Sequence, residues 1–178
     1  FKVEIMFDDK RDSTEQRSYS DSGLDHVEFL ISPNAGEPLK PLSKIASGGE
    51  MSRIMLAIKN ILANVDSIPT LIFDEIDTGI SGLAAQKVGE KLSYISKNHQ
   101  VICVTHLAQI ACMADSHYLI EKVSDSVSTE TRVIRLEGKE VDREIARILG
   151  GANISDTTLK YAKELLQNAR KFKKSACI

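Results

Sequence analysis

Three short stretches of this sequence combine residue types that could act together on a phosphate group. They are Ser47-Gly48-Gly49-Glu50 ahead of a helical pattern, Asp74-Glu75 after the apolar run Thr70–Phe73, and His106 after the apolar run 101–105. A hydroxyl and the backbone N–H groups of a helix start can hold an anion. A carboxylate at a strand end can hold a hydrated magnesium ion, and a neighbouring carboxylate can activate water. These residue types predict phosphate chemistry if the fold brings the three stretches together.

Each stretch taken alone also has a purely structural explanation. Ser-Gly-Gly before a helix is commonly an N-cap with a flexible lead-in, and two acidic residues commonly do no more than end a buried strand. A lone histidine after a strand is more often capped or solvent-facing than catalytic. Asp74-Glu75 after an apolar strand nevertheless has the form of a Walker B element. The three stretches follow one another in a regular order: one helix separates the first from the second, and one strand-helix-strand unit joins the second to the third. This order favours the functional interpretation.

The hydrophobic pattern predicts the elements that must position these residues. One helix is predicted to begin at Ser47, because apolar residues recur on one helical face at Met51, Ile54, Met55, Ile58 and Leu62. Thr70–Phe73 is predicted to be a strand buried on both faces, followed by a helix over 83–95 and a strand over 100–105. Such a unit nearly always joins parallel strands, whose carboxyl ends bind ligands. Both acidic residues and the histidine follow those ends.

The remaining segments predict a lead-in before this unit and a helical end after it. Lys2–Phe7 and 26–32 are predicted to be antiparallel strands joined by a polar loop over 8–23, with an extended, proline-rich loop over 33–41. Later in the chain we expect a short helix, two strands and two helices, over 107–114, 117–122, Thr129–Leu136, 141–149 and 155–171. The predicted fold class is α/β, a largely parallel sheet flanked by helices, with antiparallel strands at the N-terminal end.

The overall composition is that of an ordinary globular protein. With 42% hydrophobic and 27% charged residues among 178, the chain can bury a core, which excludes collagen-like and disordered classes. No apolar run approaches the roughly 20 residues that cross a bilayer, so a soluble protein without a membrane partner is expected. Three cysteines without a CxxC pair predict a reducing compartment, the cytoplasm. Because the chain starts at Phe1 without methionine, we expect a piece of a longer protein.

The residues around the three stretches resemble a known family of ATPases. Residues 44–53 (KIASGGEMSR), 73–82 (FDEIDTGISG) and 104–111 (VTHLAQIA) are similar to the signature motif, the Walker B strand and the switch histidine of an ABC-type ATPase head. In detail, and together with 32–39 and 114–118, they resemble the RecN family of DNA repair proteins. That family belongs with the structural-maintenance-of-chromosomes (SMC) ATPases. The resemblance covers essentially the whole chain.

This resemblance implies a head assembled from both ends of a long chain, which a coiled-coil arm joins. The present chain would be one lobe, the C-terminal part of that head, with 1–41 leading in, 42–150 carrying the motifs and 151–178 forming a last helix. Two heads would sandwich two ATP molecules. The implied partners are the N-terminal half of the head, a second head as a homodimer, DNA and recombination proteins. The implied location is the cytoplasm, and the nucleoid when the protein is bound to DNA.

The resemblance also assigns a role to each candidate residue. Asp74 would hold Mg²⁺ through water, Glu75 would be the general base, and His106 would contact the γ-phosphate of ATP. The residues implied to bind nucleotide across the head dimer are Ser47, Gly48, Gly49, Glu50 and Ser81. Many relatives carry aspartate where this chain has Ser81, in the loop that contacts the second head. Asp77 is a candidate to take over part of that role.

The Walker A phosphate loop is missing from these residues. The pattern G-x-x-x-x-G-K-[ST] does not occur, because the one Gly-Lys pair, at Gly138, is followed by Glu140. The resemblance implies that Walker A lies in an N-terminal segment outside this chain. We therefore expect ATPase activity in the full-length protein, and weak ATP binding and no appreciable hydrolysis from this fragment alone.

Other interpretations compete with this one. Cys103, His106, Cys112 and His117 suggest zinc, but a strand points Cys103 away from a residue three positions on. The basic C-terminal stretch could touch DNA phosphates or form a solvated helix face. For the function, the alternatives are a head piece of another SMC-type or break-repair ATPase, the nucleotide-binding domain of an ABC transporter, and an interaction module without activity.

Overall fold

The computed structural model describes residues 1–7, 21, 23–32, 36–44, 47–63, 65, 67–124 and 128–175. The chain divides into two compact units, Phe1–Ser47 and Gly48–Ile178. The sequence placed the end of the lead-in at residue 41, a few residues before this division. The predicted loop over 8–23 lies almost entirely outside the described residues.

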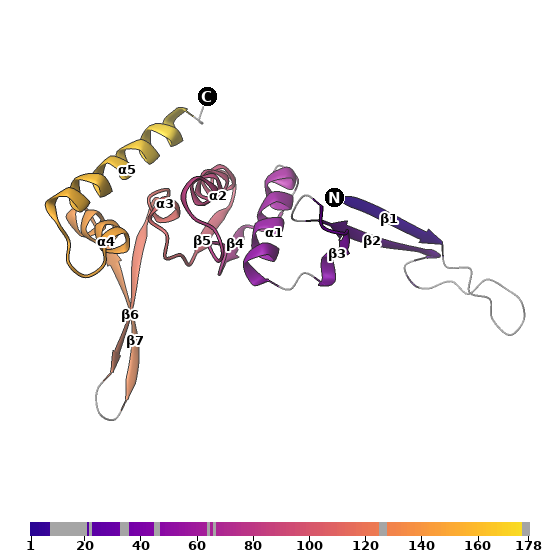
Figure 1. The fold of residues 1–178 in the computed structure, drawn as a ribbon, viewed down its shortest axis with the longest axis horizontal. Coiled ribbons are helices and arrows are strands. Elements are labelled where there is room, and N and C mark those ends of the chain that lie inside the picture. The colour runs from indigo at the N-terminus through magenta and orange to yellow at the C-terminus, as the bar shows by residue number, and fades with distance from the viewer. Residues whose placement is uncertain are drawn as a thin grey trace, which may run out of the picture. The chain divides into compact units, whose positions relative to one another are not determined.

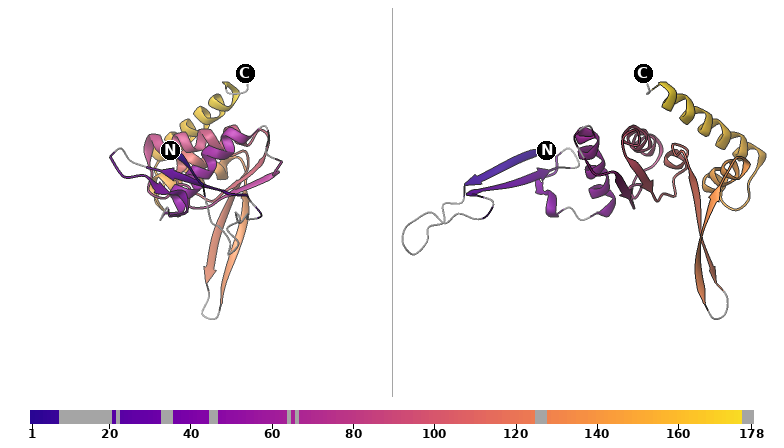
Figure 2. Two further views of the ribbon diagram at one scale, coloured as in Figure 1. Left: turned by 90° about the vertical axis from the view of Figure 1, so that its right-hand side faces the viewer. Right: turned by 180° about the vertical axis from the view of Figure 1, so that it is seen from behind.

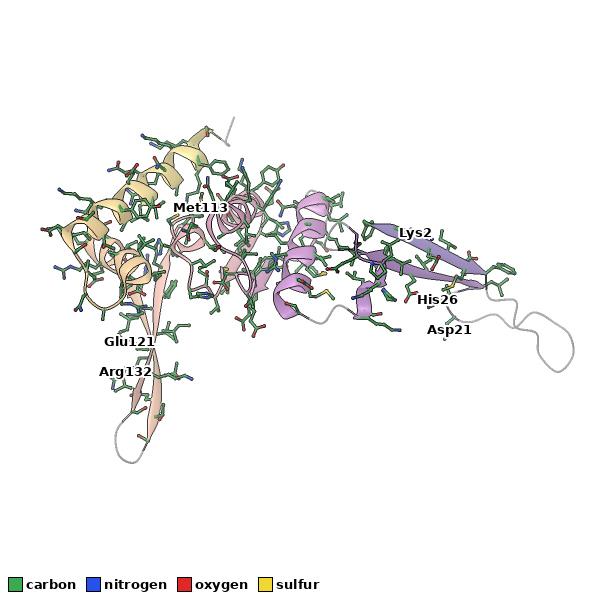
Figure 3. All side chains as sticks on the ribbon, viewed as in Figure 1. Lys2, Asp21, His26, Met113, Glu121 and Arg132 are labelled. Carbon is green, nitrogen blue, oxygen red and sulfur yellow. The ribbon has the colours of Figure 1, made fainter. Side chains whose placement is uncertain are left out.

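The first unit is a small antiparallel sheet. Strands β1 (Lys2–Phe7) and β2 (Asp25–Ile31) pair along their full length, and β3 (Lys40–Pro41) pairs with the end of β2. A short 3₁₀ helix, η1 (Leu42–Lys44), follows. Figure 3 labels Lys2 and His26 on the paired strands. The predicted antiparallel pairing of β1 and β2 is confirmed, whereas β3 was expected to be loop; its extended backbone pairs at the sheet edge, where a proline is tolerated.

The second unit contains the predicted strand-helix-strand arrangement. It begins with α1 (Gly48–Leu62), β4 (Thr70–Phe73), α2 (Gly82–Ile95) and β5 (Gln100–Cys103). β4 and β5 are parallel and paired from Thr70↔Gln100 to Phe73↔Cys103, and the N–H of Val104 continues the ladder by donating to Phe73 O at 3.0 Å. The α/β class is confirmed. The parallel part is this one pair in the described portion, while the other strands pair in antiparallel fashion.

One face of the parallel pair is packed and the other is open. Leu71 and Phe73 are buried in a cluster with Leu92 and Ile95 of α2. On the opposite face Ile72 is 70% exposed, so the prediction that β4 is buried on both faces is wrong for this chain. The physical reason is that the described helices pack against a single side of the sheet. A strand that is apolar on both faces is expected to be covered on both sides, and the described residues cover β4 on one side only.

The rest of the second unit is a hairpin and three helices. α3 (Ala108–Ala111) leads to β6 (His117–Ser124) and β7 (Thr129–Leu136), then to α4 (Lys139–Gly150) and α5 (Asp156–Ser175). β6 and β7 form an antiparallel ribbon that extends away from the helices of this unit (Figures 1 and 2), with Glu121 opposite Arg132 (Figure 3). In the described part of the chain, no helix has the length and apolar character needed to span a bilayer.

The short helix α3 lies between two hydrophobic clusters. Ile110 packs into the cluster of α1, β4 and α2, while Ala108 and Met113 pack into the cluster of α4 and α5. Lys173 of α5 donates to the carbonyl oxygens of Met113 (3.1 Å) and Ala114 (3.3 Å), just after α3. Helix α3, which follows the histidine segment in the chain, is therefore packed against both clusters. Lys173, from the basic stretch, has an internal structural role.

Candidate functional site

The glycines at the start of α1 let this helix approach the loop that follows β4. A Cβ built on Gly49 would lie 2.8 Å from Glu75 O and 3.0 Å from Thr78 Cβ. A Cβ built on Gly48 would lie 2.7 Å from Glu75 Oε2, the flexible end of a side chain. Only glycine fits at position 49 without a shift of backbone. This close approach is made to the acidic loop of the same chain.

Two polar side chains of α1 hold that loop in place. Ser52 Oγ donates to Asp74 O at 3.0 Å. Arg53 Nη1 donates to Ile76 O at 3.1 Å and to Thr78 O at 2.8 Å. The sequence reasoning did not single out Ser52 or Arg53. The available signal was their position: they lie about one helical turn after the two glycines and therefore on the same side of the helix.

The two carboxylates separate because the chain turns sharply after β4. Asp74 Oδ1 accepts the N–H of Glu75 at 2.9 Å, and the N–H of Thr78 donates to Glu75 O at 3.0 Å. Glu75 has φ = 56°, the one positive φ of a non-glycine residue in the described part of the chain. This left-handed conformation costs about 1–2 kcal/mol and is frequent at functional sites. Asp74 and Glu75 are thus positioned by a turn rather than by the regular alternation of a strand.

Asp77 joins the acidic loop to the segment that carries the histidine. Its side chain is 3% exposed, and its Oδ2 accepts hydrogen bonds from Thr105 Oγ1 at 2.5 Å and from the N–H of His106 at 2.8 Å. The ring atom His106 Nδ1 lies 3.0 Å from the same oxygen. Thr105 Oγ1 in turn accepts the N–H of Leu107 at 3.1 Å. The ring of His106 remains 74% exposed, so its far side is available to a ligand.

The ionisation of Asp77 follows from these contacts. Burial raises the pKa of its carboxyl group, but the hydrogen bonds from Thr105 and from the backbone of His106, together with the charge of His106, outweigh burial. The pKa of Asp77 is therefore below its ordinary value. Asp77 is a buried carboxylate at neutral pH that acts only as an acceptor. The sequence suggestion that it contacts a second head is not supported, because this carboxylate faces the histidine segment of its own chain.

The remaining candidates lie at the starts of two helices. Glu50 is half-buried in the first turn of α1, where its charge complements the helix dipole. Ser81 occupies the N-cap position of α2 with an extended backbone, and its side chain makes no capping hydrogen bond. Ser47 belongs to the first unit and directly precedes α1 in the chain.

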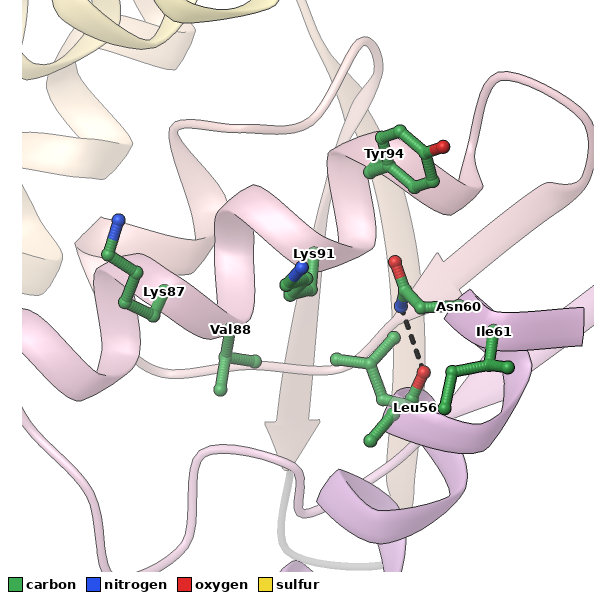
Figure 4. Close-up of a pocket in the computed structure, with 8 residues that line it drawn as sticks. Leu56, Asn60, Ile61, Lys87, Val88, Lys91 and Tyr94 are labelled. Atoms are coloured by element: carbon green, nitrogen blue, oxygen red, sulfur yellow. Dashed lines mark hydrogen bonds between the residues drawn. The ribbon is translucent and has the colours of Figure 1, made fainter. Parts of the chain in front are cut away.

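The glycines of α1, the acidic loop and the histidine segment meet at one edge of the parallel pair. β4 and β5 are in register, so the acidic loop and the histidine leave the sheet at the same end. Asp77 connects these two segments directly, and Gly49 brings the start of α1 against the first of them. A groove of about 570 Å³ lies elsewhere, between α1 and α2, and none of the candidate residues lines it (Figure 4).

The zinc alternative receives no support from these side chains. Among the residues that the structure describes, no three potential metal-binding side chains come together. Burial raises the pKa of Cys103 to about 12 and that of Cys112 to about 11. Zinc binds the thiolate, which neither residue forms readily at neutral pH.

The fold of the chain is similar to that of part of an Smc head domain. The crystal structure of the Smc head domain with a coiled coil and joint derived from Pyrococcus yayanosii matches 94% of this chain and 26% of that chain, with a TM-score of 0.51 and 20% sequence identity. No protein-family model matches the chain.

Among curated proteins, the similarity is to RecN. The DNA repair protein RecN of Treponema pallidum (strain Nichols) is 50% identical over 155 residues, and that of Bacillus subtilis (strain 168) is 49% identical over 154 residues. These alignments cover 87% and 86% of the chain but 27% of each relative. The RecN of Vibrio cholerae is 43% identical over 93% of the chain. The chain is therefore homologous to a segment of the RecN proteins, as the motifs predicted, and spans about a quarter of their length.

Proposed function

We propose that this chain is the C-terminal part of the ATP-hydrolysing head of a RecN-like protein for DNA double-strand-break repair and recombination. One observation carries the proposal. The start of α1, the acidic loop and the histidine segment are linked by direct contacts at one edge of a parallel strand pair. Helix capping and strand termination account for each stretch alone, but they do not account for this convergence. The similarity to proteins named DNA repair protein RecN supports the biological role.

Asp74 and Glu75 fit the binding and activation of Mg²⁺-ATP. Mg²⁺ in such sites uses one or two carboxylates and takes its other ligands from water and phosphate oxygens, so a single exposed carboxylate at a strand end suits it. Bound Mg²⁺ would supply neutralisation of phosphate charge. Asp74 would hold the hydrated ion, and its contact with the N–H of Glu75 keeps its carboxylate oriented. Glu75 would accept the proton of the attacking water, while His106 would contact the γ-phosphate.

The helix-start residues would act on the nucleotide of a second head. Ser47, Gly48, Gly49 and Glu50 would present a hydroxyl and the N–H groups of the first turn of α1 to its γ-phosphate, and Ser81 would contact the second head from the start of α2. Such positioned donors are worth several kcal/mol of transition-state stabilisation. The proposed assembly is a homodimer of heads with ATP bound between them.

The open face of the parallel pair supports the proposal that the N-terminal half of the head docks here. Ile72, Ile102 and Val104 are 70%, 45% and 46% exposed on the same side of β4 and β5. Contiguous apolar side chains of this kind mark a surface that another element covers. The N-terminal half would also supply the Walker A loop, and we therefore propose that the 178-residue chain alone is inactive. The further proposed partners are DNA and recombination proteins, in the cytoplasm and on the nucleoid.

ATP hydrolysis by the full-length protein, with and without DNA, tests this function. We expect DNA to stimulate hydrolysis and Glu75→Gln to lower kcat by about a hundredfold or more while ATP binding persists. Glu164→Gln, on an exposed part of α5, is the matched control and should retain activity. Unchanged turnover in Glu75→Gln would remove Glu75 as the base. A rate of ATP hydrolysis that does not change when DNA is added would favour the transporter alternative over DNA repair.

A further inference from the structure

Two nitrogen atoms of the same histidine lie close to one oxygen atom, Asp77 Oδ2. The backbone N–H of His106 donates to it at 2.8 Å and the ring atom Nδ1 lies at 3.0 Å. The hydroxyl of Thr105 is the third contact of this atom. A side chain that is otherwise exposed can sample several rotamers. Here a single buried acceptor selects the rotamer in which Nδ1 faces inward.

We propose that Asp77 is a positioning residue that holds His106 in the tautomer with a proton on Nδ1, so that Nε2 is the ring nitrogen presented to the nucleotide. The effect of this tautomer on ATP hydrolysis rests on the proposed function of His106, but the tautomer itself can be measured without ATP. Nothing in the sequence motifs assigns this role to Asp77, which the sequence offered only as a candidate for part of the contact with a second head.

The chemistry of the pair determines the tautomer. The ring atom Nδ1 lies 3.0 Å from an oxygen of an ionised carboxylate, which has no hydrogen to donate. A bare Nδ1 would bring two lone pairs together at this distance, whereas an N–H there is attracted to the negative charge, so the proton is favoured on Nδ1. The lowered pKa of Asp77 keeps the carboxylate ionised at neutral pH. In a neutral ring, Nε2 then has the lone pair; in a charged ring, Nε2 is a donor suited to a phosphate oxygen. In both states the atom that faces outward is Nε2.

Asp77 also couples the histidine to the loop of the proposed base. It lies two residues after Glu75, and Arg53 holds the carbonyl groups on either side of it, those of Ile76 and Thr78. A shift of α1 would therefore move the loop, the carboxylate and the ring of His106 together. This connection joins all three sequence motifs through one buried side chain.

The direct test is nitrogen NMR of the histidine rings in the 178-residue chain at a pH where they are neutral. His106→Gln assigns the resonances of residue 106 among the four histidines. We expect a protonated Nδ1 and an unprotonated Nε2 in the parent chain. Asp77→Asn, which is nearly isosteric, should shift His106 toward the other tautomer, as the corresponding change does in the serine protease triad. A protonated Nε2 in the parent chain would overturn the proposal without any variant.

A purely structural role for Asp77 makes a different prediction. Thr105→Val removes one hydrogen bond of the same carboxylate but leaves the ring contact, so it should disturb the loop without changing the tautomer. If Thr105→Val and Asp77→Asn change the ring resonances equally, Asp77 only anchors the loop and the proposal is wrong.

A double-mutant cycle in the full-length ATPase tests the functional consequence. We expect Asp77→Asn to lower kcat at least about tenfold with little change in KM for ATP, and to cause no further loss in a His106→Gln background. Equal losses in both backgrounds would show that Asp77 does not act through His106. If Glu75→Gln leaves kcat unchanged, the proposed function is wrong, but the result of the tautomer measurement still holds.

Discussion

Gly49 of α1 lies against the backbone carbonyl of Glu75, so closely that a Cβ built on Gly49 would be 2.8 Å from that oxygen. The contact fixes the start of the helix to the residue that we propose as the general base. Because the helix start is also proposed to face a second head, docking of that head and the position of the base are mechanically connected. The connection uses backbone atoms, which cannot move aside as a flexible side chain can.

Replacing Gly49 with alanine should therefore destabilise the chain. We expect the free energy of unfolding to fall by about 1–3 kcal/mol, because the added methyl group overpacks against backbone and against Thr78. Urea unfolding of the parent and the variant measures the difference.

Gly48→Ala is the matched control for that experiment. Its added methyl group meets the carboxylate end of Glu75, which can rotate away, so its cost should be smaller. Alanine also favours the helix over glycine by up to about 1 kcal/mol. A cost for Gly49→Ala no greater than that for Gly48→Ala would contradict the close backbone contact.

Arg53 should stabilise the acidic loop through its guanidinium group. Arg53→Met keeps much of the aliphatic stem but removes the donors to Ile76 O and Thr78 O. Two hydrogen bonds of this kind contribute about 1–3 kcal/mol together, and we expect unfolding free energy to fall by that amount. Arg143→Met, at an exposed position of α4, is the control and should change stability little. Equal effects of the two changes would show that the Arg53 contacts do not stabilise the loop.

The sequence predicted those features that depend on local patterns. The apolar run of β4 and the helical period of α2 set the strand-helix-strand unit, and both elements are present. The strand ends then placed the acidic pair and His106 at one edge, because parallel strands in register end together. Local periodicity was therefore sufficient to locate this part of the candidate site.

Features that depend on contacts between distant segments were not predictable. The positive φ of Glu75 and the inward orientation of Asp77 both depend on how one loop packs against α1 and β5. The exposure of Ile72 depends on a layer that the described residues do not provide. The three-residue spacing between Asp74 and Asp77 carries no information about which carboxylate is buried. Tertiary contacts decide these points.

The two described cysteines should react slowly in the folded chain. Burial raises the pKa of Cys103 to about 12 and that of Cys112 to about 11, from an ordinary value of 9.0. Since the thiolate is the reactive form, alkylation by iodoacetamide near neutral pH should be about a hundredfold or more slower than in the denatured chain. Mass spectrometry of each cysteine over time measures the rates. Similar rates in the folded and denatured chains would contradict this burial.

His99 should stabilise the connection between α1 and β4. Its ring is 7% exposed, with Nδ1 2.7 Å from Ile68 O and Nε2 3.2 Å from Ala63 O. His99→Leu removes both contacts and should lower the free energy of unfolding by about 1–3 kcal/mol. His26→Leu, at an exposed position of β2, is the control. A His99→Leu chain as stable as the parent would show that these ring contacts do not stabilise the connection.

The buried carboxylate of Asp77 should make stability depend on pH in the acid range. Its pKa is lower in the folded chain than the ordinary value of 3.8, so folding favours the ionised form. The resulting stabilisation is complete above the unfolded pKa and is lost as the pH falls through the folded pKa. Urea unfolding from neutral pH down into this range should show the stability of the parent chain falling toward that of Asp77→Asn. Asp25→Asn, at an exposed position of β2, controls for general acid effects. A difference between the parent and Asp77→Asn that stays constant with pH would show that ionisation of Asp77 does not contribute to folding.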